Sequence, residues 1–89
     1  MDEETVERVR AAVRDIPPGE TASYGEIAAR AGLASARLVG RILAEDGHDL
    51  PWHRVLRADG TCAPHIATEQ SARLRAEGVF LVAGRLPRR

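Results

Sequence analysis

The side chains best suited to chemistry lie in one short stretch, Trp52-His53-Arg54, and at the single cysteine, Cys62. A histidine can act as a base, and a thiolate can attack a carbon atom because sulfur has an available lone pair. The indole nitrogen of Trp52 is a poor nucleophile, since its lone pair belongs to the aromatic ring. Trp52 offers instead a large apolar face on which a base or an alkyl group can pack, unless it serves only as core.

No cluster of residues in the sequence has the spacing of a metal site. The histidines His48, His53 and His65 and the thiol of Cys62 match no recognised zinc pattern. Cys62 lies ten residues after Trp52, and the only histidine close to it in sequence is His65. We therefore expect neither a metal ion nor another cofactor.

The charge of the chain is unevenly distributed although it sums to zero. Residues 1–29 carry seven acids and three arginines, a net of −4, whereas residues 30–89 carry ten arginines and six acids, a net of +4. All 13 basic residues are arginine, whose planar fork suits phosphate and base edges. A GC-rich genome would produce the same arginine bias, so composition alone does not establish DNA binding.

The overall composition is that of an ordinary soluble globular domain. With 89 residues, 44% of them hydrophobic and 29% charged, the chain suits a single domain with a modest core. The sequence has no run of 18 apolar residues, so it predicts no transmembrane helix. The acidic N-terminus is not followed by the apolar region of a secretory signal. One cysteine cannot form an internal disulfide, which fits a cytoplasmic location and a monomer in a reducing compartment.

The first half of the chain predicts helices. Apolar residues at helical spacing indicate a helix over residues 4–15, which Pro17-Pro18-Gly19 ends. Ser23 and Glu26 have the spacing of a capping box, which would begin a second helix over about residues 24–31.

A third helix is predicted over about residues 35–44, after a tight turn in which Gly32 suits a left-handed cap. Arg37 and Arg41 are four residues apart and share its outer face. Two short helices joined in this way indicate a helix-turn-helix.

The second half predicts short strands and one helix. Residues 52–57 suit a turn followed by a strand, residues 68–77 suit a helix, and residues 79–82 suit a short apolar strand. We therefore expect one domain over residues 1–83. The segment 84–89 is expected to be a disordered basic tail whose arginines contact phosphate.

Three segments in order carry a family pattern: Ile16-Pro17-Pro18-Gly19-Glu20-Thr21-Ala22-Ser23-Tyr24-Gly25-Glu26-Ile27-Ala28, Ser35-Ala36-Arg37-Leu38-Val39-Gly40 and Pro51-Trp52-His53-Arg54-Val55. Over residues 6–82 the chain resembles the C-terminal DNA-binding domain of O6-alkylguanine-DNA alkyltransferases. In those enzymes the last motif has cysteine, the alkyl acceptor, where this chain has Trp52. A tryptophan at that position is the mark of the alkyltransferase-like subfamily.

The resemblance implies a fold class that is α/β to mainly α, a winged helix-turn-helix with short strands. It also implies a protein that is not an enzyme and that binds double-stranded DNA containing O6-alkylguanine. Such a protein docks in the minor groove, flips the damaged nucleotide out of the stack and marks the lesion for nucleotide excision repair proteins.

The resemblance assigns roles to individual residues. The lesion pocket would comprise Trp52, Tyr24, Val55 and His53, with the backbone carbonyls of Trp52 and Val55 accepting from the guanine amino group. Arg37 would be the finger that fills the gap left by the flipped base. Tyr24 would also press on a phosphate.

Further residues would bind DNA or support the motif. Ser35, Ala36 and Arg41 would contact DNA together with Arg37, and Arg54 and Glu77 would hold the motif in place. Two stretches depart from the enzymes' pattern. Where the enzymes have a glycine-rich loop that contains a tyrosine, this chain has Thr61–Ile66. Where they have an asparagine hinge, it has the acidic stretch 45–49.

Two other functions remain open from the sequence alone. A transcription regulator would use the helix-turn-helix in the major groove, but this leaves the motif of residues 51–55 unexplained. An active alkyltransferase would have to use Cys62 as its nucleophile.

Overall fold

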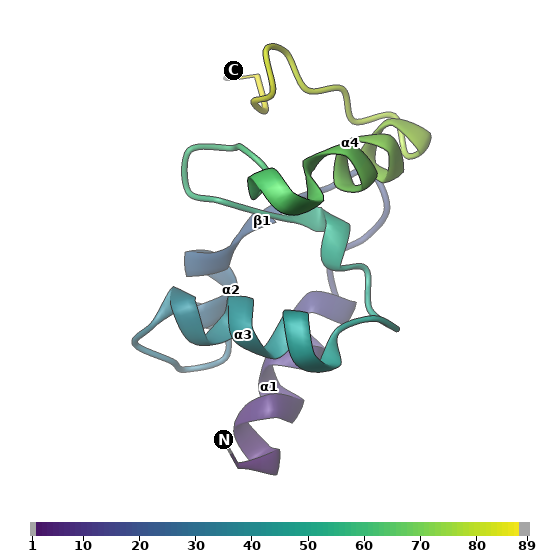
Figure 1. Cartoon of the computed structure of the whole chain (residues 1–89). Coiled ribbons are helices and arrows are strands. Elements are labelled where there is room, and N and C mark those ends of the chain that lie inside the picture. The colour runs from purple at the N-terminus through teal and green to yellow at the C-terminus, as the bar shows by residue number, and fades with distance from the viewer. Residues whose placement is uncertain (1, 88–89) are drawn as a thin grey trace.

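The computed structural model describes residues 2–87 and consists mainly of helices. In Figure 1 the first three helices lie toward the N-terminal end of the molecule, and the last helix lies with the C-terminal segment at the opposite end. The elements in chain order are α1 (Glu3–Arg14), β1 (Ala22–Ser23), α2 (Tyr24–Arg30), α3 (Ala36–Asp46), η1 (Trp52–Arg54), β2 (Val55–Leu56), η2 (Pro64–Ile66) and α4 (Ala67–Ala76).

Local sequence explains where α1 begins and ends. The Asp2 carboxylate caps it by accepting a hydrogen bond from the Thr5 amide at 2.7 Å. Pro17 and Pro18 follow its last turn and cannot continue the helix. The predicted helix of residues 4–15 is thus confirmed to within one residue at each end.

The helix-turn-helix is formed by α2 and α3. Ser23 and Glu26 form both hydrogen bonds of the predicted capping box, each 3.0 Å long. Gly32 has a φ of +72°, the left-handed conformation that glycine adopts without strain. The helix α3 runs to Asp46, two residues beyond the predicted end.

The main hydrophobic core lies beneath these helices. Partly buried residues, Trp52 among them, pack against it. The fully or nearly buried members of this main core cluster are Val9, Ala12, Val13, Ile16, Ala22, Ile27, Ala28, Ala31, Val39, Ile42, Leu43, Leu50 and Val55.

A two-stranded parallel sheet joins the helix-turn-helix to the rest of the chain. Ala22 pairs with Val55 and Ser23 with Leu56. The strand β1 was not predicted, because two residues are too few to show an alternating pattern. Beyond the sheet a second core cluster contains Leu56, Cys62 and Leu74.

The prediction of a strand over residues 79–82 is wrong. Among the described residues this segment has only an isolated bridge, from Val82 to Arg85. Val79 and Leu81 pack against the second core cluster, whereas the side chains of Phe80 and Val82 are 60% and 65% exposed. This alternation suits a strand, but the segment lacks a partner strand, so no sheet forms.

The described part of the predicted disordered tail is held against the domain. The Leu86 amide donates to the Gly60 carbonyl at 2.9 Å, and the Leu86 side chain packs against the second core cluster. Residues 88 and 89 of that predicted tail lie outside the described residues. Within residues 2–87 no helix combines the length and the apolar character that a membrane crossing requires.

Candidate functional site

The motif Pro51–Val55 forms a single turn that leads into β2. The Trp52 amide donates to the Leu50 carbonyl at 2.8 Å, and the Arg54 amide donates to Pro51 at 3.1 Å. The Val55 amide donates to the Trp52 carbonyl, and the chain then extends into the sheet. The sheet pairing with β1 therefore fixes the motif beside the start of α2.

Arg54 joins three segments that are far apart in sequence. Its Nε donates to both carboxylate oxygens of Glu77, at 3.0 and 3.2 Å, and its Nη1 donates to the Ile16 carbonyl at 2.8 Å. The side chains of Arg54 and Glu77 are only 13% and 17% exposed. This charged fork links the end of α4, the segment after α1 and the motif.

His53 binds the same carboxylate. Its Nε2 lies 3.0 Å from Oε2 of Glu77. Because an ionised carboxylate only accepts, Nε2 carries a proton and donates it. Nδ1 is buried and has no hydrogen-bond partner among the described residues. The Glu77 carboxylate thus contacts both His53 and Arg54.

The environment of Glu77 strongly favours its ionised form. The Arg54 guanidinium, assisted by His53 and the Gly19 amide, lowers the pKa of Glu77 from its ordinary value of 4.5 to about 2, although partial burial opposes this. The contribution of this ionised group to stability is therefore present above pH 4.5 and is lost as the pH falls toward 2.

Replacing Glu77 with glutamine should destabilise the fold at pH 7 and reduce its sensitivity to acid. We expect a loss of about 3 kcal/mol, because the partly buried Arg54 would lose its charged partner. Urea unfolding midpoints at neutral pH and at about pH 3, which is below the ordinary pKa of a carboxyl group, measure both effects. An equal fall in stability for the wild type and Glu77→Gln on acidification would contradict this role. Glu69→Gln, an exposed carboxylate on α4, is the control.

Gln70 also supports the motif, and its role was not predicted from the sequence. It is 1% exposed, and its Nε2 donates to the carbonyls of His53 at 3.0 Å and Val55 at 2.8 Å. Gln70, Leu74 and Glu77 share one helical face, which was the signal available in the sequence. The Val55 carbonyl therefore already has one donor, and its second lone pair is the one left for the predicted guanine contact.

Trp52 is half-buried and has polar neighbours. Its ring packs against the main core cluster and meets the His53 ring edge-on, with centroids 6.2 Å apart. The guanidinium of Arg73 on α4 lies over the indole, with Cζ 5.3 Å from the ring centroid. Trp52 is therefore neither fully buried core nor a freely exposed surface residue.

Tyr24 is the first residue of α2 and packs against the main core cluster. Burial raises the pKa of the Tyr24 hydroxyl above its ordinary value. Cys62 raises this pKa further, and Arg57 lowers it. The side chain is thus half-buried, and its contact with phosphate stays a prediction.

The start of α3 presents the predicted DNA-binding residues to solvent. Ser35 precedes the helix and makes no side-chain capping hydrogen bond, and Ala36, Arg37 and Arg41 are exposed. Arg41 donates to Glu45 at 3.0 Å. Within residues 2–87 no ion pair involves Arg37. Of these two arginines, Arg37 is therefore the one whose guanidinium is available to contact a ligand.

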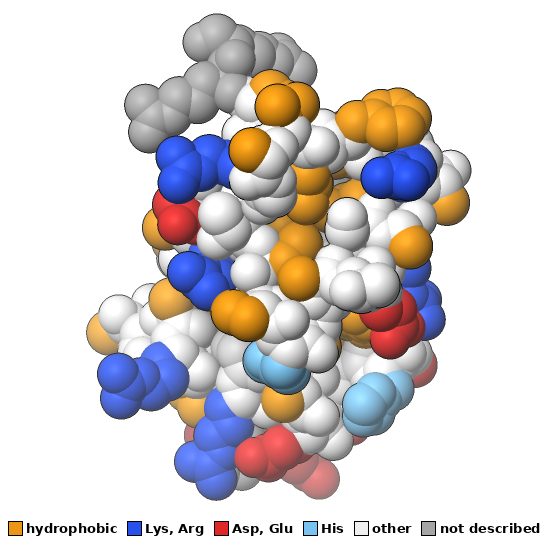
Figure 2. Space-filling model, turned by 45° about the horizontal axis from the view of Figure 1, so that its top comes forward, with side chains coloured by type: hydrophobic (Ala, Val, Ile, Leu, Met, Phe, Trp, Pro, Cys, Tyr) orange, Lys and Arg blue, Asp and Glu red, His pale blue; other side chains and the backbone are white. Residues whose placement is uncertain are grey.

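The charged side chains on the face drawn in Figure 2 are dispersed. Figure 2 shows a face on which apolar side chains occupy the middle and arginines are spread around it rather than gathered in one patch. The acidic stretch 45–49 is partly neutralised, since Arg10 binds the Asp49 carboxylate and the Asp46 carbonyl. This pairing ties α1 to the end of α3.

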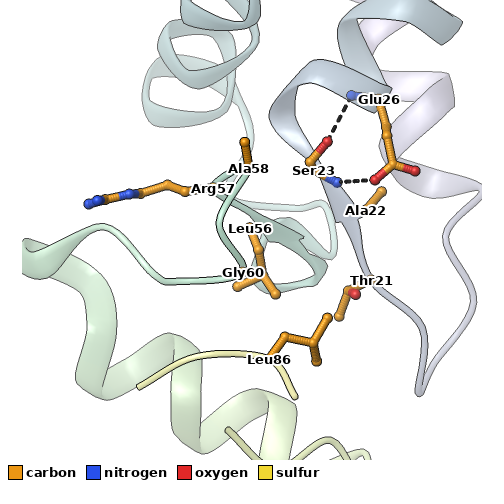
Figure 3. A pocket seen from close by; sticks show the side chains of 9 residues that line it. All are labelled: Thr21, Ala22, Ser23, Glu26, Leu56, Arg57, Ala58, Gly60 and Leu86. Atoms are coloured by element: carbon orange, nitrogen blue, oxygen red, sulfur yellow. Dashed lines mark hydrogen bonds between the residues drawn. The ribbon is translucent and has the colours of Figure 1, made fainter. Parts of the chain in front are cut away.

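A small hollow of about 100 Å³ lies beside the sheet, and Figure 3 shows Leu86 opposite Thr21 across it, with Arg57 extending away. A second, open depression lies between α1 and Arg30. Neither of these two hollows on the described surface is lined by Trp52, Tyr24, Val55 or His53. His53 and Val55 are 8% and 0% exposed, so of the four predicted pocket residues only Trp52 and Tyr24 offer ring surface.

Histidine, cysteine and carboxylate side chains do not gather into a metal-binding group of three or more anywhere in residues 2–87. The arrangement offers aromatic surface and cations rather than a ligand set.

These features define a helix-turn-helix domain of the kind that binds DNA, with a rigid Trp-His-Arg turn beside it. The chain matches the DNA-binding domain of 6-O-methylguanine DNA methyltransferase over residues 4–79 and belongs to this family. The predicted resemblance and helix-turn-helix fold are thus confirmed.

Relatives of known name share much of the chain. It is 40% identical over 81 residues to the DNA base-flipping protein of Escherichia coli, with 84% of this chain and 62% of that relative covered. It is 39% identical over 80 residues to Alkyltransferase-like protein 1 of Schizosaccharomyces pombe, with 81% and 73% covered. The chain thus spans less than two thirds of the length of the E. coli relative.

A solved structure agrees in fold. The crystal structure of S. pombe Atl1 in complex with damaged DNA containing O6-carboxymethylguanine superimposes with a TM-score of 0.83 and 34% identity. The match covers 92% of this chain and 82% of the other.

Proposed function

We propose that this chain binds duplex DNA containing O6-alkylguanine and does not transfer the alkyl group. It docks in the minor groove through α3, flips the damaged nucleotide with Arg37 and stacks the base on Trp52. The bound lesion is then marked for nucleotide excision repair, a step that rests on the resemblance to the alkyltransferase-like subfamily.

The observation that carries this proposal is the position of Trp52 in a rigid turn. Arg54, Glu77, His53 and Gln70 fix the backbone on both sides of the indole. An aromatic face held in place by buried polar contacts is a stacking surface for a base, because base stacking on an aromatic side chain is worth ~1–3 kcal/mol.

The relatives support the same activity. The E. coli relative is named a DNA base-flipping protein, and the S. pombe protein forms a complex with damaged DNA. In this chain, Arg37 is exposed at the start of α3, where a side chain can enter the groove that the helix contacts.

The nucleophiles present support the proposed absence of alkyl transfer. By the resemblance, Trp52 stands at the motif position of the reactive cysteine, and an indole is a poor nucleophile. Cys62 is 9% exposed, and burial raises the pKa of its thiol, which lowers the thiolate fraction at neutral pH. Both features support a binding protein rather than an acceptor of alkyl groups.

A binding titration tests the proposal. Two duplexes of the same sequence, one with guanine and one with O6-methylguanine, should differ at least ~10-fold in Kd, which is about 1.4 kcal/mol. The difference arises for two reasons: flipping a weakly paired base costs less free energy, and the methyl group adds apolar surface to the stack on Trp52. Equal affinity for the two duplexes would show that the chain does not recognise the lesion.

Mass spectrometry tests the absence of chemistry. After long incubation with methylated DNA the protein mass should be unchanged and the DNA should keep its lesion. A gain of one methyl group in the wild type that is absent from Cys62→Ser would make the chain an alkyltransferase. Binding of one particular undamaged sequence would favour the transcription regulator.

A further inference from the structure

The Trp52 ring, on which the proposed function depends, already has an occupant on one face. The Cζ atom of Arg73 lies 5.3 Å from the ring centroid, within the range of a cation–π contact. The ring also packs against the main core cluster and meets the edge of His53. A base that stacks on Trp52 must therefore compete for ring surface.

A neighbouring carboxylate holds Arg73 in this position. Nε and Nη2 of Arg73 lie 2.9 and 2.7 Å from Oε2 of Glu69, one helical turn earlier. The side chains of Arg73 and Glu69 are 51% and 59% exposed. Solvent weakens an ion pair that is this exposed, so Arg73 is oriented by Glu69 but remains able to move away from the indole.

We infer that Arg73 is a cap on the Trp52 ring that a flipped base displaces. The inference rests on the proposed function, in which the base stacks on Trp52. In the free protein the guanidinium covers a ring face that would otherwise be apolar and open to water. When a base enters, Arg73 moves toward solvent and its cation–π contact with Trp52 is lost. The site therefore binds the base less tightly than it would without Arg73. Arg73 thereby sets the affinity of the Trp52 site without touching the lesion.

The cap can be tested without DNA, because Trp52 is the only tryptophan in the chain. Fluorescence quenching by acrylamide reports how accessible its ring is. Arg73→Ala should raise the quenching constant, and Arg75→Ala, an exposed arginine on the same helix, should leave it unchanged. An unchanged quenching constant in Arg73→Ala would show that Arg73 does not cover the ring.

Competition with the base is tested by binding to the duplex containing O6-methylguanine. Both variants lose one positive charge, so Arg75→Ala provides the baseline for the electrostatic effect. Arg73→Ala should bind about two- to fivefold more tightly than Arg75→Ala, the size expected of an exposed cation–π contact. Binding equal to or weaker than that of Arg75→Ala would overturn the inference.

The two failures can be told apart. If the wild type shows no preference for the damaged duplex, the proposed function fails, and the acrylamide result still decides whether Arg73 covers Trp52. If the preference exists and Arg73→Ala binds no more tightly than Arg75→Ala, the proposed function stands and the inference that a base displaces Arg73 from Trp52 is wrong.

Discussion

Replacing Trp52 with alanine is expected to remove most of the preference for O6-alkylguanine while general affinity for DNA persists. The stacking face is lost, and such stacking is worth ~1–3 kcal/mol per base, or about 5- to 150-fold in Kd. The exposed arginines and the start of α3 are unchanged, so binding to phosphate continues. Titrations with matched duplexes that carry guanine or O6-methylguanine measure both quantities.

Trp52→Phe is the matched variant, because it keeps an aromatic face at the same position. It should retain more of the preference than Trp52→Ala. Since Trp52 also packs against the main core cluster, thermal melts are needed to establish that both variants are folded at the temperature of the titration. A folded Trp52→Ala protein with its preference intact would mean that the indole serves only as core.

Arg37→Ala is expected to reduce nucleotide flipping and to weaken binding of the damaged duplex about tenfold, or about 1.4 kcal/mol. The guanidinium is exposed at the start of α3, and no ion pair involves it within the described residues, so it is available to fill the vacated stack. A fluorescent base analogue at the lesion position follows flipping, and its signal change should be smaller in the variant.

Arg41→Ala is the control for charge. Arg41 is also exposed on α3, but it is paired with Glu45. Its loss should mainly reduce the dependence of Kd on salt, by up to about one unit of the log–log slope for a phosphate contact. If Arg37→Ala and Arg41→Ala behaved alike in flipping and affinity, Arg37 would be an ordinary surface charge.

Features set by neighbouring residues were predictable from the sequence. The capping box at Ser23 and Glu26 and the left-handed Gly32 depend on local backbone chemistry, and both are present. The apolar run 79–82 was predicted as a strand because composition alone favours one. Val79 and Leu81 do pack against the second core cluster, but the segment has no partner strand beyond the Val82–Arg85 bridge, and an unpaired extended segment does not form a sheet.

The candidate site was predictable only where a motif named it. Arg54 and Glu77 were expected to lie at the motif, and they are in contact there, with His53 bound to the same carboxylate. Gln70 and Arg73 were not expected to take part, because their roles depend on how α4 packs across the motif. The helical face shared by Gln70, Leu74 and Glu77 shows which side of α4 packs inward, but it does not show which segment that side contacts.

The division of the core into two clusters has a consequence for local unfolding. The main core cluster contains the helix-turn-helix, whereas Leu56, Cys62 and Leu74 form a much smaller second cluster that is joined to it by a two-residue ladder and the Arg54–Glu77 fork. In native-state hydrogen exchange, α4 should therefore open at a lower free energy than α2 and α3. Such a partly open molecule would keep its groove-docking helix but would lose the support beneath Trp52, so it would still bind DNA while being unable to distinguish damaged from undamaged sites.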